Sequence, residues 1–174
     1  MQIDTYHKYF STWFTSAKLH TQIGDAVKQV SKSKRIFFIG NGGSNSICSH
    51  MMEDYAKMGR FPTFAFSDPA LITCFANDYG YEMAMAEWLK IHFVEGDLLV
   101  AISSSGESKN IVNAAAYASS IGKNVITLTG FKEENTLSRM GALNFHLPVS
   151  NYGIVECFHQ VILHLVLDMI TNTN

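Results

Sequence analysis

The sequence predicts an α/β protein with a three-layer, doubly wound and mostly parallel sheet, preceded by a leading N-terminal helix. Short apolar runs alternate with segments of helical period, the pattern of strands joined by crossover helices. The run at 96–102 is apolar nearly throughout, as expected for a strand that helices cover on both faces. Several runs end in glycine or hydroxyl residues, and the carboxyl ends of parallel strands share the edge where ligands bind.

Composition favours one domain over residues 1–174. The 174 residues are 47% hydrophobic and 16% charged, enough for a sizeable core. A net charge of −2 with scattered basic residues excludes a basic nucleic-acid surface. The sequence shows no signal pattern and no run of 18 apolar residues, so no membrane association is expected. Cys48, Cys74 and Cys157 are far apart, which favours reduced thiols and a cytoplasmic location.

Residues 1–31 are expected to form the leading helix, and 32–174 the α/β core with a C-terminal helix. Apolar positions from Ile3 to Val30 recur at helical spacing, which predicts one long helix or two short ones. Four aromatic residues between 9 and 14 give this segment a broad apolar face. Such a face suits self-association.

The segment 35–57 reads as a strand, a glycine turn and a helix. Gly40, Gly42 and Gly43 let the backbone turn tightly and approach a ligand, and Ser44 or Asn45 is expected to cap the helix. The free N–H groups of a first helical turn favour an anion such as phosphate. Any α/β protein can carry glycines at such a turn, so the loop alone leaves the ligand open.

The helix after this turn carries His50, Glu53 and Asp54 at positions i, i+3 and i+4. Imidazole and carboxylate therefore share one helix face, which suits a metal-ligand pair or an acid/base pair. A plain surface contact between His50 and Asp54 explains the same spacing.

The next predicted strand is 62–66, followed by a helix whose cap and first turn are 67–69. Asn77 and Asp78 stand between two apolar helical runs, and Gly80 closes the break. Their side chains are expected to face a cleft, although Asn-Asp-x-Gly is also an ordinary turn.

The strand at 96–102 ends in a serine-rich loop, and a helix follows from about Glu107 to Ile121. Four hydroxyls and the N-terminal amides of this helix predict a phosphate cradle that uses no cation; the hydroxyls belong to Ser103, Ser104, Ser105 and Ser108. A further strand is expected at 123–130, a short helix at 137–140, and a last edge strand at 143–149 because Pro148 lies near its end.

The final helix, at about 152–170, is strongly apolar but carries ionisable side chains. Glu156 and His164 are eight residues apart, about 12 Å of rise and roughly 80° of rotation. One metal ion can hardly take both from one straight helix. Either the two act at different points, or copies from different subunits meet at one site. His164 and Asp168, at i and i+4, form a second imidazole–carboxylate pair.

Several motifs together resemble one known family: GNGGSN at 40–45 with His50, ND at 77–78, ISSSGES at 102–108, LTG at 128–130, and a terminal helix with His164. Together they resemble the sugar isomerase (SIS) domain family, and within it the phosphoheptose isomerases. The resemblance implies a flavodoxin-like core and a homotetramer with one Zn²⁺ per subunit. It also implies conversion of sedoheptulose 7-phosphate to D-glycero-D-manno-heptose 7-phosphate, for lipopolysaccharide or capsule synthesis.

The resemblance also assigns roles to single residues. It implies Asp54 as catalytic base and His164 as acid. The four serines would hold the phosphate, and the metal ligands would be His50, Asp54, Glu156 and His164. The remaining substrate contacts would come from Asn41, Gly42, Gly43, Ser44, Asp54, Asn77, Asp78 and Glu156.

Two positions depart from the family pattern: Asp54 replaces a glutamate, and Glu156 replaces a glutamine. The carboxylate of Asp54 is one methylene shorter, and a misplacement of about 1 Å can cost on the order of 100-fold in rate. Glu156 adds a negative charge that would tighten a divalent metal.

The alternative is a non-catalytic SIS-domain tetramer that binds a partner protein or senses a sugar phosphate. The presence of both His50 and His164 argues for the enzyme. The apolar leading and final helices predict a homotetramer with active sites at subunit interfaces.

Overall fold

The structure, a computed structural model, describes residues 3–122 and 124–172. Lys123, expected to open a strand, lies outside the described residues, as do 1–2 and 173–174. The helices are α1 (Ile3–Phe14), α2 (Ala17–Lys32), α3 (Gly43–Lys57), α4 (Pro69–Tyr79), α5 (Tyr81–His92), α6 (Lys109–Ile121) and α7 (Tyr152–Thr171), with a 3-10 turn η1 (Leu137–Arg139). The strands are β1 (Ile36–Ile39), β2 (Thr63–Ala65), β3 (Leu98–Ser103), β4 (Val125–Gly130) and β5 (Leu143–Leu147).

The five strands form one parallel sheet in the order β2-β1-β3-β4-β5. The chain first moves outward from β1 to β2 and then crosses to β3 on the other side of β1. The order therefore reverses between β1 and β3, which is where open α/β sheets bind ligands. The doubly wound fold and the edge position of β5 are both confirmed.

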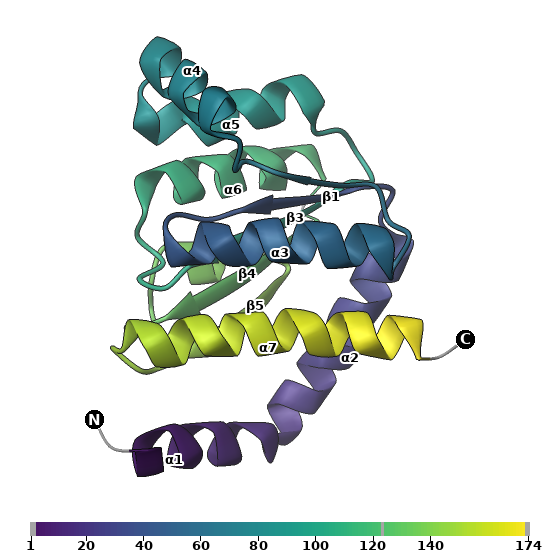
Figure 1. The fold of residues 1–174 in the computed structure, drawn as a ribbon, viewed down its shortest axis with the longest axis vertical. Helices are drawn as coiled ribbons and strands as arrows, with labels where there is room; N and C mark the ends of the chain where they lie inside the picture. Colours follow the sequence, from purple (N-terminus) through teal and green to yellow (C-terminus); the bar gives the residue numbers. More distant parts are fainter. Residues whose placement is uncertain (1–2, 123, 173–174) are drawn as a thin grey trace.

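The sheet is covered on both faces (Figure 1). Phe38 and Val100 pack on the side of α2, α3 and α7, while Phe37 and Leu99 pack on the side of α5 and α6. Successive side chains of a strand point to opposite faces of the sheet, so alternate strand residues belong to two separate apolar layers. Burial on both faces explains why these strands read as continuous apolar runs.

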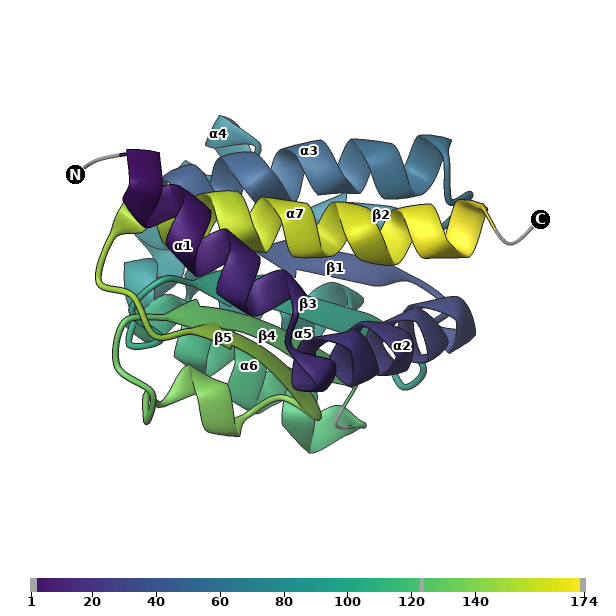
Figure 2. The same cartoon turned by 90° about the horizontal axis from the view of Figure 1, so that it is seen from below.

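The leading segment folds as two helices, the second of the two possibilities left open by its spacing. The chain breaks after α1, and Ser16 takes an extended conformation at the start of α2. Four aromatic residues of α1, Tyr9, Phe10, Trp13 and Phe14, are partly buried against the α2–α7 side of the core, while Tyr6 is exposed. Figure 2 shows α1 on the same side of the molecule as α7, with α7 lying beside α3.

Among the described helices, α7 is long and apolar enough to cross a membrane by length and composition alone. It is also a core helix, with eight buried residues packed against the sheet layer.

Helix starts depend on local backbone geometry. Asp68 caps α4 through its Oδ1, which accepts the N–H groups of Ala70 and Leu71, as its sequence predicts. The expected cap at Ser44 or Asn45 is wrong. Helix α3 already begins at Gly43, and the residue at its N-cap is Gly42, whose φ of 53° favours glycine. The start of α3 is therefore formed by the backbone conformation of Gly42, and no side chain caps it.

Candidate active site

A pocket of about 160 Å³ lies at the switch point, between the loops after β1 and β3 and the first turns of α7. Its lining is mostly small and polar: Asn41, Ser44, Ile102, Ser103, Ser104, Ser105, Ser108, Tyr152 and Glu156. It therefore unites the glycine loop and the four predicted serines.

Close backbone packing shapes this pocket. A Cβ at Gly40 would lie 2.7 Å from the Ser44 carbonyl, and one at Gly106 would overlap the Asn135 side chain. Gly106 also has a φ of 67°, a left-handed conformation that other residues rarely adopt. Only glycine fits either loop without displacing its neighbours.

The serine loop is ordered by its own hydroxyls. Ser103 Oγ donates to Ser108 Oγ at 3.2 Å and accepts the Gly106 N–H at 3.2 Å. Ser104 differs, because its Oγ is buried and has no hydrogen-bond partner within the described residues. An unpaired buried hydroxyl is costly, so its presence in the pocket lining points to a ligand oxygen.

Residues that sequence reasoning missed hold the glycine loop in place. Asn41 and Asn110 exchange amide hydrogen bonds of 2.9 and 2.8 Å, and Tyr81 donates its hydroxyl to Asn41 Oδ1 at 2.8 Å. Both partners come from helices on the other side of the sheet. No short motif links them to Asn41, so only the fold reveals this contact.

A second group of polar side chains forms where α3 packs beside α7. Cys48, Met51 and Tyr55 bury one face of α3, and Tyr55 donates its hydroxyl to the Leu163 carbonyl at 2.8 Å. The neighbouring stripe of α3, with His50 and Asp54, is thereby held against α7 at the level of His164.

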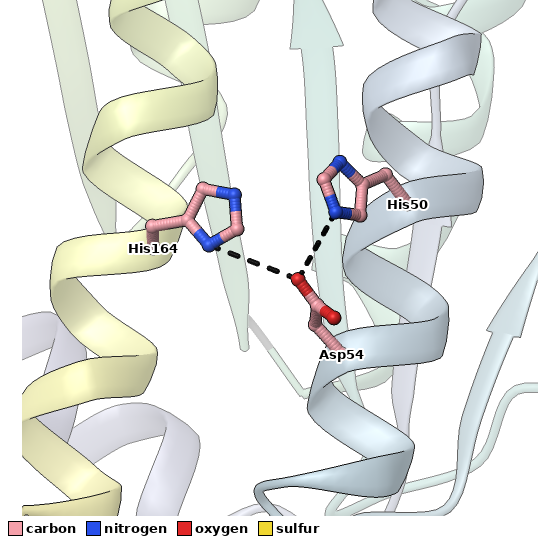
Figure 3. Close-up of side chains that lie close together, drawn as sticks. All are labelled: His50, Asp54 and His164. Carbon is pink, nitrogen blue, oxygen red and sulfur yellow. Dashed lines mark ion pairs between the residues drawn. The ribbon is translucent and has the colours of Figure 1, made fainter.

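His50, Asp54 and His164 converge in a cluster open to solvent (Figure 3). Asp54 Oδ2 lies 3.2 Å from His50 Nε2 and 3.8 Å from His164 Nδ1. The side chain of Asp54 is 16% exposed, against 51% for His50 and 34% for His164. Glu53, one residue before Asp54, is exposed and outside the cluster. The carboxylate is the inner member of the group.

The donor set of this cluster fits a divalent transition metal. Each of the three side chains offers one ligand atom, and these atoms lie within 4.8 Å of one another. Two imidazole nitrogens and a carboxylate oxygen, with an open side, match the ligands of catalytic zinc sites. Cys48, on the same helix, is not a candidate metal ligand. Burial raises the pKa of its thiol well above the ordinary range, and the thiolate is the form that binds a metal.

Gln160 was not singled out from the sequence, yet it contacts both histidines. Its Nε2 lies 3.1 Å from His50 Nδ1 and 2.9 Å from His164 Nε2. The spacing of four residues to His164, one helical turn, was the available signal.

Two groups of predicted site residues lie away from the cluster in this chain. The Glu156 carboxylate lies where a Cβ on Gly43 would approach it to 2.6 Å, at the serine pocket. Asn77 and Asp78 occupy the last turn of α4, exposed and hydrogen-bonded to each other at 2.9 Å. The chain thus brings together the serines, the glycine loop and Glu156 at one point, and His50, Asp54 and His164 at another.

His159, on the buried side of α7, does not join either group. Its Nε2 lies 3.2 Å from the Thr129 carbonyl, and burial lowers its pKa to about 4. A neutral imidazole here joins α7 to the carboxyl end of β4.

A larger cavity of about 350 Å³ lies beside the edge strand β5, lined by Lys18, Glu133 and His146 among others. It contains none of the predicted site residues. We place the site at the switch point and the α3–α7 contact, where the acid/base groups and the ligand-binding loops are.

Comparison with known proteins identifies the family of this chain. Residues 15–130 match the SIS domain family. The phosphoheptose isomerase of Fusobacterium nucleatum is 35% identical over 144 residues, which cover 79% of this chain and 73% of that protein. The phosphoheptose isomerase of Sodalis glossinidius is 32% identical over 158 residues, covering 85% of this chain and 80% of the relative.

Solved structures agree with the fold. A phosphoheptose isomerase from Francisella tularensis is 26% identical, with a TM-score of 0.76 over 99% of this chain and 100% of that one. The phosphoheptose isomerase from Neisseria gonorrhoeae, 22% identical, has a TM-score of 0.82 over 97% and 94% of the two chains. The family match and the relatives above 30% identity together place this chain in the SIS-domain family, in its phosphoheptose isomerase branch.

Proposed function

We propose that this protein is an aldose–ketose isomerase that converts sedoheptulose 7-phosphate to D-glycero-D-manno-heptose 7-phosphate. The observation that carries the proposal is the position of α3, which begins in the serine pocket and carries two members of the His/Asp cluster. Ser44 and His50 are six residues apart, about 9 Å of helix rise. A sugar phosphate can therefore hold its phosphate at one end while its reacting carbons lie near the cluster.

The phosphate belongs at the serine pocket. The Ser104 hydroxyl is free to donate to a phosphate oxygen, and the N-terminus of α6, behind Ser108, favours the negative charge. No cation is needed there. Holding the phosphate fixes the carbon chain, so that binding energy far from the reaction contributes to orientation.

His50, Asp54 and His164 are the residues that would hold one Zn²⁺ per subunit. When bound, the ion would act as a Lewis acid on the substrate carbonyl and its enediolate. Glu156, also expected as a ligand, lies at the serine pocket within one chain. Its role as a ligand stays a prediction that needs a second subunit.

Asp54 is the proposed base and His164 the proposed acid. Asp54 removes the proton from the carbon next to the carbonyl, and the same proton is returned to the neighbouring carbon, so that no group is gained or lost. His164 hands a proton to the carbonyl oxygen as it becomes a hydroxyl, and takes up the proton that the neighbouring hydroxyl loses as it becomes the new carbonyl. The partner-binding and sensing alternative is not favoured, because it gives no reason for the two imidazoles and the carboxylate to converge.

The proposed assembly is a homotetramer that works in the cytoplasm on heptose for lipopolysaccharide or capsule. Two features support shared sites. Helices α1, α2 and α7 leave an apolar hollow of about 250 Å³ lined by Phe14, Ile23 and Leu165 among others. Asn77 and Asp78 are exposed in the last turn of α4, outside both the serine pocket and the His/Asp cluster, as expected of residues that complete a site together with a second copy.

The direct test is to incubate the protein with sedoheptulose 7-phosphate, with related ketose phosphates as controls, and to follow the products by NMR. We expect the heptose 7-phosphate as product and zinc near one ion per chain by elemental analysis. A protein purified without chelator that lacks metal and turns over none of these sugars contradicts the proposal. Light scattering tests the tetramer, and removal of residues 1–31 is expected to abolish both assembly and activity.

A further inference from the structure

Gln160 closes a ring of four side chains around the proposed metal site. Both imidazoles turn one nitrogen toward Asp54, which Figure 3 shows, and the other nitrogen of each ring lies against the Gln160 amide. The order around the ring is Asp54, His50, Gln160, His164. Each histidine therefore has a partner at both nitrogens, and the two partners are different in kind.

This arrangement defines which nitrogen of each histidine carries the proton when no metal is bound. The Asp54 carboxylate on one side of each ring can only accept, and with Gln160 Nε2 on the other side the two amide N–H groups donate to His50 Nδ1 and His164 Nε2, which are then unprotonated. The single proton of each neutral ring is then on His50 Nε2 and His164 Nδ1, directed toward the Asp54 carboxylate.

A metal ion held by Asp54 and the two histidines needs the opposite tautomers. The nitrogens that face Asp54 must give their lone pairs to the metal, so each proton moves to the nitrogen that faces Gln160. Those N–H groups then need acceptors. An amide turned by 180° offers Oε1, whose two lone pairs can accept both. Ligating histidines are generally held by such a partner on their second nitrogen.

We propose that Gln160 is a positioning residue that sets the tautomers of His50 and His164, donating to both without metal and accepting from both with metal. This inference rests on the metal site of the proposed function. Gln160 contacts the two histidines that would bind the metal, and it need not touch the metal or the sugar itself. The amide is suited to both states because it has two donors on one side and one double acceptor on the other.

Two variants separate the donor from the acceptor role. Gln160→Leu has similar size and helix propensity but no hydrogen-bonding group. We expect it to weaken Zn²⁺ binding by about 10- to 100-fold, the usual effect of losing such a partner. Gln160→Glu keeps two acceptor oxygens and loses the donors, so it should bind Zn²⁺ at least as tightly as the wild type. Chelator competition measures both affinities, and circular dichroism checks that both variants fold.

NMR of ¹⁵N-histidine-labelled protein tests the tautomers directly, without substrate. Metal-free wild type is expected to carry its protons on His50 Nε2 and His164 Nδ1, and Zn²⁺ should move both to the other nitrogen. In metal-free Gln160→Leu only the Asp54 carboxylate still favours these tautomers, so the preference should weaken, most at His164, whose Nδ1 is the farther from Asp54. Unchanged tautomers and affinity in Gln160→Leu overturn the proposal, as does a zinc-loaded wild type that keeps the metal-free tautomers. Because neither readout uses a sugar, lack of isomerase activity alone would overturn only the proposed reaction.

Discussion

The two halves of the site are built in different ways. The serine pocket is made of two loops whose glycines let the backbone come close, and most of its lining residues are neighbours in sequence. The His50–Asp54–His164 cluster depends instead on the packing of two helices whose cluster residues are more than 100 positions apart in the sequence. A loop of this kind is defined by local sequence. The cluster exists only when α3 and α7 lie in the correct register.

The cluster should therefore be the more fragile half, and its carboxylate the most sensitive point. Asp54→Asn keeps the size of the side chain but removes the base, so we expect kcat to fall by about 10²- to 10⁴-fold. Glu53→Gln is the matched control, since Glu53 is exposed and outside the cluster. Steady-state kinetics on sedoheptulose 7-phosphate measures kcat for both variants and the wild type. Wild-type turnover in Asp54→Asn, or an equal loss in both variants, rules out Asp54 as the base.

Acid should weaken both halves together, because α7 serves both and is joined to β4 through His159. Burial lowers the pKa of His159 to about 4, below the ordinary 6.5, so the folded state resists protonation. Stability from this neutral group is complete above pH 6.5 and declines as the pH falls toward 4. At pH 5 the loss is about 2 kcal/mol.

Urea unfolding of wild type and of His159→Leu at pH 7 and pH 5 measures this effect. The variant is expected to be less stable overall but to lose less between the two pH values. His7→Gln serves as control, because His7 is exposed on α1. An unchanged pH dependence in His159→Leu contradicts the assignment.

Much of the fold and one half of the site could be predicted from sequence for the same physical reason. Strands buried on both faces are continuous apolar runs, and tight loops need glycine, as at Gly106. The start of α3 was mispredicted because backbone geometry at Gly42 replaced a side-chain cap. The contact of Gln160 with His50, and those of Tyr81 and Asn110 with Asn41, could not be predicted, since each joins elements that meet only in three dimensions.

The serine pocket should respond to mutation differently from the cluster. Ser104→Ala removes a buried hydroxyl that has no hydrogen-bond partner among the residues that the structure describes, so stability should stay the same or rise slightly. The KM for the sugar phosphate should rise about 10-fold, because one hydrogen bond to a charged group is lost.

Ser120→Ala is the control for this variant, since Ser120 is exposed at the far end of α6 and bonds only locally. Thermal melting and steady-state kinetics are the measurements. A clear loss of stability with unchanged KM would show that the Ser104 hydroxyl serves the fold and not the phosphate.

The smallest expected effect tests whether the two halves are separable. Tyr55→Phe removes the hydroxyl that donates to the Leu163 carbonyl and so fixes α3 against α7. The cost in stability should be about 1 kcal/mol, since this carbonyl also lies inside a helix and keeps its backbone partner. The slackened contact lies next to His164 but far along α3 from the serine loop. Zn²⁺ affinity, measured by chelator competition, should therefore fall a few-fold while KM stays unchanged. If KM instead rises in step with the loss of Zn²⁺ affinity, the serine pocket also depends on helix register, and the contrast between a locally encoded and a packing-encoded half does not hold.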